Sequence, residues 1–208
     1  MRRLFFAILC VVGLGVSTEA SAQIDLGRAL GALINEAANV QSTPDYYAKL
    51  RESAPAKSKI AGTWKYLSAR VEYLGANSVA QVAVPQLEAF IASELKRNGV
   101  VEGCCKATIN RDGTAKITAG DAEYKGSYTY DQSTAKVKAS YQHTSHNYKV
   151  SGYLKLSSSR LMVLIDMRDV LREITVLSPD LAKDENFLMV KGVVDSFSDL
   201  YLSVLLTK

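Results

Sequence analysis

Four tyrosines are the side chains of this sequence best suited to contact a small molecule. Tyr124, Tyr128, Tyr141 and Tyr148 lie in a stretch where apolar and polar residues alternate with a period of two. Because side chains alternate between the two faces of a strand, all four rings are predicted on one face. Small residues beside phenol rings leave room for a ligand that the hydroxyl groups can orient. The small residues predicted for the same face are Ala107, Ala115, Ala119, Gly126, Ala135, Ala139 and Gly152.

The same positions can instead form ordinary core. This alternative holds if helices predicted at 77–97 and 185–197 cover the interior, because their apolar stripes must be buried somewhere. The face itself is well specified. A slip by one residue would exchange the two faces and bury several lysines without partners, at a large desolvation cost.

Other residues do not form the patterns that catalysis or metal binding requires. His143 and His146 are three apart in a predicted strand end or turn, where that spacing usually separates two side chains, and no acidic residue or cysteine lies nearby in sequence. The run from Ser157 to Ser159 is typical of a turn and lacks the surroundings of a serine nucleophile. We therefore predict no catalytic residues, no metal site, no cofactor and a protein that is not an enzyme.

Lysines occupy the opposite face of the same strands. Charged strands resist pairing with other sheets, so a solvent-exposed face accounts for these lysines. Alternatively, they attract an anionic partner such as a glycan or a lipid headgroup. The net charge of +4 is only mildly basic and does not favour nucleic acid as a partner. The lysines are Lys125, Lys136, Lys138, Lys149 and Lys155.

The N-terminus has the three-part pattern of a cleaved secretory signal. Arg2 and Arg3 precede an apolar run over residues 4–16, and small residues follow at Ala20 and Ala22. We expect residues 1–22 to be a signal peptide and the rest to be exported to the periplasm, the cell envelope or the medium. The apolar run is shorter than the about 20 residues of a membrane-spanning helix, and we predict no transmembrane segment.

Only Cys104 and Cys105 remain after that cleavage, and they are adjacent. Because strand neighbours point to opposite faces and a disulfide between neighbours needs a strained turn, we predict that the two are not bonded to each other. Cys105 is predicted on the inner face and Cys104 outside. A strained redox-active pair and an intermolecular bridge through the outer thiol are the alternatives.

Residues 23–59 are predicted to form an N-terminal helix and a linker. One apolar stripe extends over residues 24–39, and residues 41–59 turn polar, with at most one helical turn around 46–50. A single domain over residues 60–208 follows. Its first strand extends from Gly62 to about Tyr73, and its helix over 77–97 either begins at Pro85 or kinks there.

From residue 101 the period of the sequence changes from that of a helix to that of a strand. Six alternating segments are followed by helices near 168–177 and 185–197 and by a last strand over 200–206. Closing these strands into a barrel with the strand from Gly62 covers their apolar face and removes exposed edges. We predict a mainly β fold with α additions: an eight-stranded antiparallel barrel with a helical insertion after the first strand and helices before the last. The six segments lie at about 105–109, 115–119, 124–130, 135–141, 148–156 and 161–167.

Short sequence motifs in residues 60–208 also resemble those of a known protein family. They are Gly62-Thr63-Trp64-Lys65-Tyr66, Asn110-Arg111-Asp112-Gly113-Thr114 and Gly126-Ser127-Tyr128-Thr129-Tyr130-Asp131. With the helical insertion, they make residues 60–208 similar to a family of secreted, lipocalin-like (calycin-type) bacterial proteins of unknown function. The resemblance implies a partly closed barrel with helices at the insertion and near the C-terminus, and Pro85 departs from its uninterrupted helix. By analogy of fold it also implies a small apolar ligand.

Two functions of different class fit these features. The first is a non-enzymatic exported protein that binds a small apolar or amphipathic ligand in or at the mouth of the barrel. The second is a structural or interaction protein of the cell envelope without a small-molecule ligand. Its contact surface would be the N-terminal helix and the helical layer.

Overall fold

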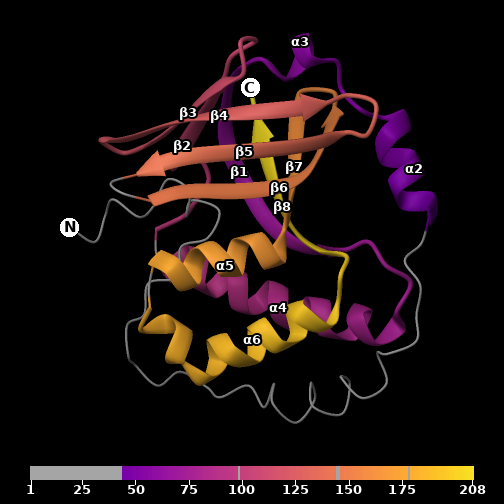
Figure 1. The fold of residues 1–208 in the computed structure, drawn as a ribbon, viewed down its shortest axis with the longest axis vertical. Helices are drawn as coiled ribbons and strands as arrows, with labels where there is room; N and C mark the ends of the chain where they lie inside the picture. The colour runs from indigo at the N-terminus through magenta and orange to yellow at the C-terminus, as the bar shows by residue number, and fades with distance from the viewer. Residues whose placement is uncertain (1–43, 98, 144–145, 178) are drawn as a thin grey trace.

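The fold is a closed barrel of eight antiparallel strands with a layer of helices at one end (Figure 1). The computed structural model describes residues 44–208 except 98, 144–145 and 178. The strands are β1 (Gly62–Tyr73), β2 (Cys105–Ile109), β3 (Thr114–Ala119), β4 (Ala122–Asp131), β5 (Lys136–His143), β6 (His146–Ser157), β7 (Arg160–Asp166) and β8 (Leu200–Thr207). The helices are α2 (Pro44–Glu52), α3 (Lys57–Ile60), α4 (Ser78–Arg97), α5 (Met167–Leu177), the 3₁₀ turn η3 (Leu181–Lys183) and α6 (Glu185–Ser196).

Each strand pairs with its neighbours in sequence, and β8 pairs back onto β1. The closing register extends from Lys65 opposite Thr207 to Tyr73 opposite Leu200. The sheet is therefore closed all round, whereas the family resemblance implied a barrel that is only partly closed. The predicted number of strands, their antiparallel order and the helices between them are confirmed.

The predicted inner face is also confirmed. Along β4 burial alternates residue by residue, with Tyr124 and Tyr128 turned inward and Lys125 turned out. The strand β1 departs from a simple alternation, because a bulge between Tyr66 and Ser68 shifts the register by one residue. Side chains that face inward are therefore even-numbered before the bulge and odd-numbered after it.

The helices α4, α5 and α6 lie together across one end of the barrel (Figure 1). Each turns an apolar stripe toward the strands, with Leu87 on α4, Ile174 on α5 and Phe187 on α6 all at most 2% exposed. These residues belong to one buried cluster that also contains the inward side chains of the barrel. The start of α6 is fixed by Asp184, whose carboxylate accepts a hydrogen bond from the Phe187 backbone N–H at 3.0 Å. The barrel and the helical layer thus share a single core.

The insertion helix α4 begins at Ser78 and continues through Pro85. Of the two predicted alternatives, a helix that starts at the proline is wrong. Pro85 lies on the exposed side of the helix, where the backbone carbonyl that loses its N–H partner can bond to water, while Ala83 and Leu87 face the core. Among the described helices, none combines the length and hydropathy needed to cross a membrane.

Two short helices occupy the described part of the segment for which the sequence predicts a linker. The helix α2 extends the single predicted turn and packs on the outside of the barrel (Figure 1). Leu50 is 2% exposed in a small outer cluster with Leu164 and Tyr201. The Tyr47 hydroxyl donates a hydrogen bond to Asp199 Oδ1 at 2.6 Å. The predicted signal peptide (1–22) and the predicted helix over 24–39 lie outside the described residues.

Trp64 is buried near the start of β1, with 1% of its surface exposed. Its Nε1–H donates a hydrogen bond to the Ile60 carbonyl oxygen at 2.8 Å, which ties α3 to the barrel. The Lys208 Nζ lies 4.7 Å from the centre of the indole ring. Trp64 therefore contacts both the segment before β1, through Ile60, and the segment after β8, through Lys208.

We predict that Trp64→Ala lowers the free energy of unfolding by about 3–5 kcal/mol, because it leaves a large unfilled volume in the core. Denaturant unfolding followed by circular dichroism measures the loss. Trp64→Phe keeps most of the packing and should lose much less. An unchanged unfolding midpoint for Trp64→Ala would contradict the role of Trp64 in the core.

Candidate functional site

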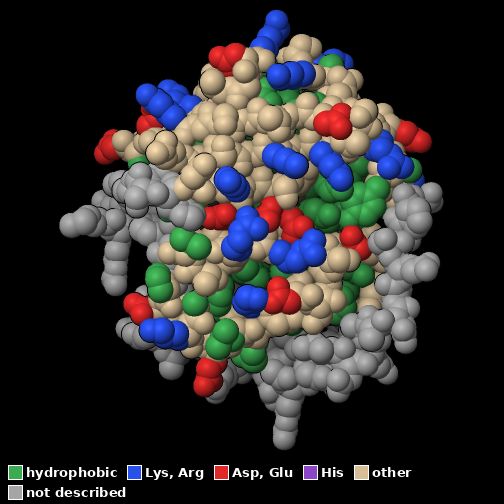
Figure 2. Space-filling view, viewed as in Figure 1, with side chains coloured by type: hydrophobic (Ala, Val, Ile, Leu, Met, Phe, Trp, Pro, Cys, Tyr) green, Lys and Arg blue, Asp and Glu red, His purple; other side chains and the backbone are tan. Residues whose placement is uncertain are grey.

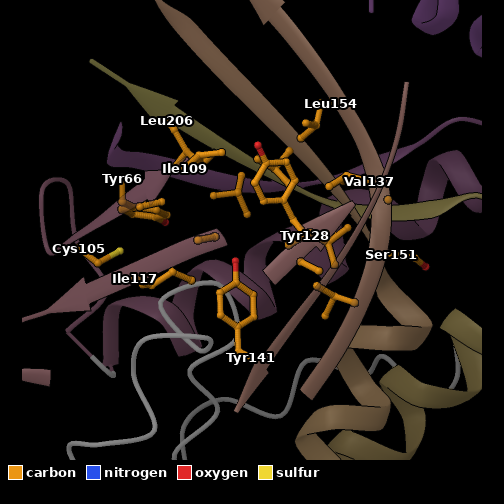
Figure 3. A pocket seen from close by; sticks show the side chains of 18 of the residues that line it. Tyr66, Cys105, Ile109, Ile117, Tyr128, Val137, Tyr141, Ser151, Leu154 and Leu206 are labelled. Atoms are coloured by element: carbon orange, nitrogen blue, oxygen red, sulfur yellow. The ribbon is translucent and has the colours of Figure 1, made fainter. Parts of the chain in front are cut away.

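A cavity of about 150 Å³ lies inside the barrel (Figure 3). Strands supply most of its wall, with inward side chains such as Ala139, Val150 and Leu206. Ile60 of α3 contributes at one place, and Val170 and Ile174 of α5 contribute at another. The interior therefore keeps an unfilled space, and its helical wall comes from α3 and α5, since its lining includes no described residue of α4 or α6.

The four candidate tyrosines are all inward, but they do not all border the cavity. Tyr128 and Tyr141 line it, and Figure 3 shows both rings projecting into the space between the strands. Tyr124 and Tyr148 are each 4% exposed and are not among the lining residues. Tyr66 of β1 lines the cavity and was missed, because the four candidates were chosen from the alternating stretch after residue 101 alone.

The hydroxyl of Tyr128 is already used by the protein. It donates a hydrogen bond to the backbone carbonyl of Asn110 at 2.6 Å, which ties the ring to the turn between β2 and β3. Burial, and then the nearby charge of Asp112, raise the pKa of Tyr128 above its usual value. The Tyr128 ring therefore forms part of the cavity wall, while its hydroxyl is held by the Asn110 carbonyl.

Tyr141 differs from Tyr128 in its polar end. Its hydroxyl makes no hydrogen bond within the described part of the chain, and its ring projects into the cavity (Figure 3). Burial raises the pKa of Tyr141 to about 12, which favours the neutral phenol. A neutral phenol can both donate and accept a hydrogen bond, so Tyr141 offers a polar contact to a molecule inside the barrel.

Three further polar residues along the wall, Lys116, Ser151 and Glu173, direct their polar groups to partners within the protein. The Lys116 ammonium lies 3.0 Å from Glu123 in an exposed ion pair. The Ser151 hydroxyl donates to Asp169 Oδ2 at 2.6 Å. The Glu173 Oε1 accepts the Lys149 backbone N–H at 3.2 Å. Carbon atoms consequently form nearly all of the cavity surface.

One side of the cavity is closed by a helix instead of a strand. In the register, β7 covers β6 only from Gly152 onward, so the backbone N–H groups of Ser151 and Lys149 extend beyond it. Two carboxylates one turn apart on α5 accept these donors. Asp169 Oδ2 accepts from Ser151 at 2.7 Å, and Glu173 accepts from Lys149. The edge of β6 is thereby satisfied by side chains, and α5 is held against the barrel.

The histidines and cysteines singled out from the sequence lie on β5, on β6 and at the start of β2. His143 and His146 are opposite each other in the register of the β5–β6 hairpin. Cys105 lines the cavity and is 8% exposed, as predicted for the inner face. The prediction that Cys104 lies outside is wrong, because Cys104 precedes β2 and packs half-buried against the core. The two cysteines are not bonded to each other, as predicted. Within the part of the chain that the structure describes, groups of three or more His, Cys, Asp or Glu suited to a metal ion do not occur.

Comparison with protein families gives a match over most of the chain. A family described as a lipocalin-like domain (DUF4923) matches residues 33–208. The chain belongs to this lipocalin-like family. The resemblance predicted from Gly62, Trp64 and the turn motifs is thereby confirmed, and the closed eight-stranded barrel agrees with the description of the family.

Comparisons with individual proteins add little to the lipocalin-like assignment. No curated protein matches the sequence at a significant level. Among solved structures, a DUF4847 family protein from Bacteroides vulgatus is similar, with 12% sequence identity and a TM-score of 0.39. The match covers 72% of this chain and 96% of that one.

Titration of the phenols at high pH tests the burial of the tyrosines. Burial raises the pKa of both Tyr141 and Tyr130 to about 12 in the folded protein. The unfolded chain loses these protons near pH 10, so their contribution to stability is complete below pH 10 and declines between about pH 10 and 12. We expect ultraviolet absorbance to show late-ionising phenols and the melting temperature to fall over the same interval. Ionisation of all 11 tyrosines near pH 10 in folded protein would contradict this prediction.

Proposed function

We propose that this lipocalin-like protein is a non-enzymatic binding protein that holds a small apolar molecule inside its barrel. The observation that carries the proposal is the cavity of about 150 Å³, whose surface is almost entirely carbon. An apolar cavity of this size accepts a molecule of about the size of benzene, because water gains few hydrogen bonds from its walls. Burial of the apolar surface of the ligand then drives binding.

The volume of the cavity restricts the size of the ligand more than the barrel fold does. Sites for drug-sized molecules are about 300–1,000 Å³, so a cavity of about 150 Å³ accepts one small ring or a short hydrocarbon segment. Tyr141 adds a single hydrogen-bonding group to this surface. The favoured ligand is therefore compact and apolar, with at most one polar atom placed to meet Tyr141.

We also propose export as the setting of this function. The support is the pattern of the N-terminal sequence, in which Arg2 and Arg3, the apolar run and Ala22 form a cleavable signal. The lysines on the outer face of the strands then meet solvent outside the cytoplasm, while the tyrosine face holds the ligand.

We predict that Ala139→Leu abolishes the binding of benzene, because the larger side chain enters the cavity that Ala139 lines. Thermal stability should be retained or rise by about 0.5–2 kcal/mol, as expected when a cavity is filled. Binding is measured as the increase in melting temperature with benzene concentration.

The matched control for this experiment is Ala119→Leu. Ala119 packs against the same core but does not line the cavity, so its variant should bind benzene as the unaltered protein does. Absence of benzene binding to the unaltered protein, together with a ligand-free protein in native mass spectrometry, would overturn the proposal. The interaction-protein alternative would then lead.

We predict that Tyr141→Phe separates polar from apolar ligands. Loss of one hydroxyl contact should weaken phenol binding by about three- to tenfold and leave benzene binding unchanged. Stability should not fall, because the hydroxyl makes no hydrogen bond within the described residues. Calorimetric titration of both compounds measures the difference. Equal weakening of both would show that Tyr141 acts through the shape of the cavity alone.

A further inference from the structure

A second hollow lies on the outside of the barrel, against the same strands. It is a groove of about 340 Å³ between the outer face of β4, β5 and β6 and the helix α5. Its volume falls within the range of small-molecule sites. Its lining includes several charged and hydroxyl side chains, although carbon forms most of its surface. The lining hydroxyl and charged side chains are Ser127, Thr129, Lys138, Ser140, Lys149, Ser151, Asp169 and Arg172.

Two lysines of this groove are close together without a compensating carboxylate. Lys138 lies opposite Ser151, and Lys149 lies opposite Ser140, so the two lysines are diagonal neighbours across β5 and β6. Diagonal neighbours in a sheet are about 7–8 Å apart, within reach of each other's long side chains. Both are exposed, and neither forms an ion pair within the described residues. Like charges at this separation repel each other, and an anion placed between them removes that cost.

The acidic residues beside the groove are already used. Asp169 Oδ1 pairs with Arg172 Nη1 at 2.7 Å, and Glu173 Oε1 lies 3.1 Å from Arg172 Nη2. The same two carboxylates accept the edge donors of β6. Figure 2 shows this arrangement, with acidic and basic side chains together where the barrel meets the helices and further cations above them on the barrel. The positive charge of Lys138 and Lys149 is therefore left for a partner from outside.

Hydroxyl groups complete the polar surface of the groove. Ser127 Oγ and Ser140 Oγ are 3.0 Å apart on neighbouring strands, and either can be the donor. Ser140 lies opposite Lys149 in the register, which places a hydroxyl next to a cation. Short hydroxyls beside ammonium groups suit an oxyanion, because both supply hydrogen-bond donors around several oxygen atoms.

We propose that this groove binds an oxyanion of the phosphate or sulfate class, held between Lys138 and Lys149 and oriented by Ser127 and Ser140. The site lies on the outer surface of the wall whose inner surface borders the cavity, and it does not depend on a ligand in the barrel. A free oxyanion and the phosphate of a lipid headgroup share this chemistry. The experiment distinguishes these two sources.

The test is a titration with inorganic phosphate, followed by the amide chemical shifts of the protein in nuclear magnetic resonance. We expect saturable shifts at Ser127, Ser140 and Lys149, and binding weakened about tenfold or more in Lys138→Gln/Lys149→Gln. The matched control is Lys125→Gln/Lys155→Gln, which removes the same charge from outward positions that do not line the groove. It should bind phosphate as the unaltered protein does.

A second arm uses vesicles of phosphatidylcholine with and without phosphatidylglycerol. Binding to the anionic vesicles that the groove variant loses and the control retains also supports the site, and it assigns the oxyanion to a lipid headgroup. Phosphate binding without vesicle binding supports the site with a free oxyanion as its ligand. The proposal is overturned if neither probe binds, or if the control variant loses binding as much as the groove variant.

Discussion

The width of an eight-stranded barrel is the constraint on which the rest of the structure depends. Once β8 pairs with β1, the number of strands and their tilt together set the circumference, and the interior is just wide enough for side chains. The size of the side chain at each inward position then decides whether the interior is filled. In the register Tyr128 is paired with Ala139 and Tyr141 with Gly126, so large and small inward groups lie side by side and part of the interior stays unfilled.

The outside of the barrel is completed by segments that are not strands. On one side α2 covers an apolar strip that includes Leu164 and Tyr201, and on another α5 satisfies the edge of β6 through Asp169 and Glu173. Each of these contacts protects a surface that would otherwise pair with other chains. The groove with Lys138 and Lys149 lies beside the second contact and stays open. The outer surface is therefore divided into covered apolar parts and an accessible polar part.

The sequence was sufficient for the elements and for their faces, because the period of two between residues 105 and 166 is strong and each turn is short. The sequence was less informative about how far along the barrel each inward side chain lies. Tyr124 and Tyr148 have the same alternation as Tyr128 and Tyr141, yet of these four only Tyr128 and Tyr141 border the cavity, because alternation gives the face of a side chain and not its height along the barrel. The bulge after Tyr66 and the full length of α2 beyond one turn were not predicted, because both result from packing against strands far away in the chain.

The pairing of β1 with β8 has a consequence for the order of folding. The junctions from β2 to β7 join neighbours in sequence and can form as local hairpins, whereas Lys65 must find Thr207 at the other end of the chain. Contacts at such separation form slowly, because a long loop must close before the contact stabilises it. During synthesis the first strand is complete long before its partner exists. An incomplete chain is therefore an open sheet with two unpaired edges, and it has no enclosed interior until the final strand has been made.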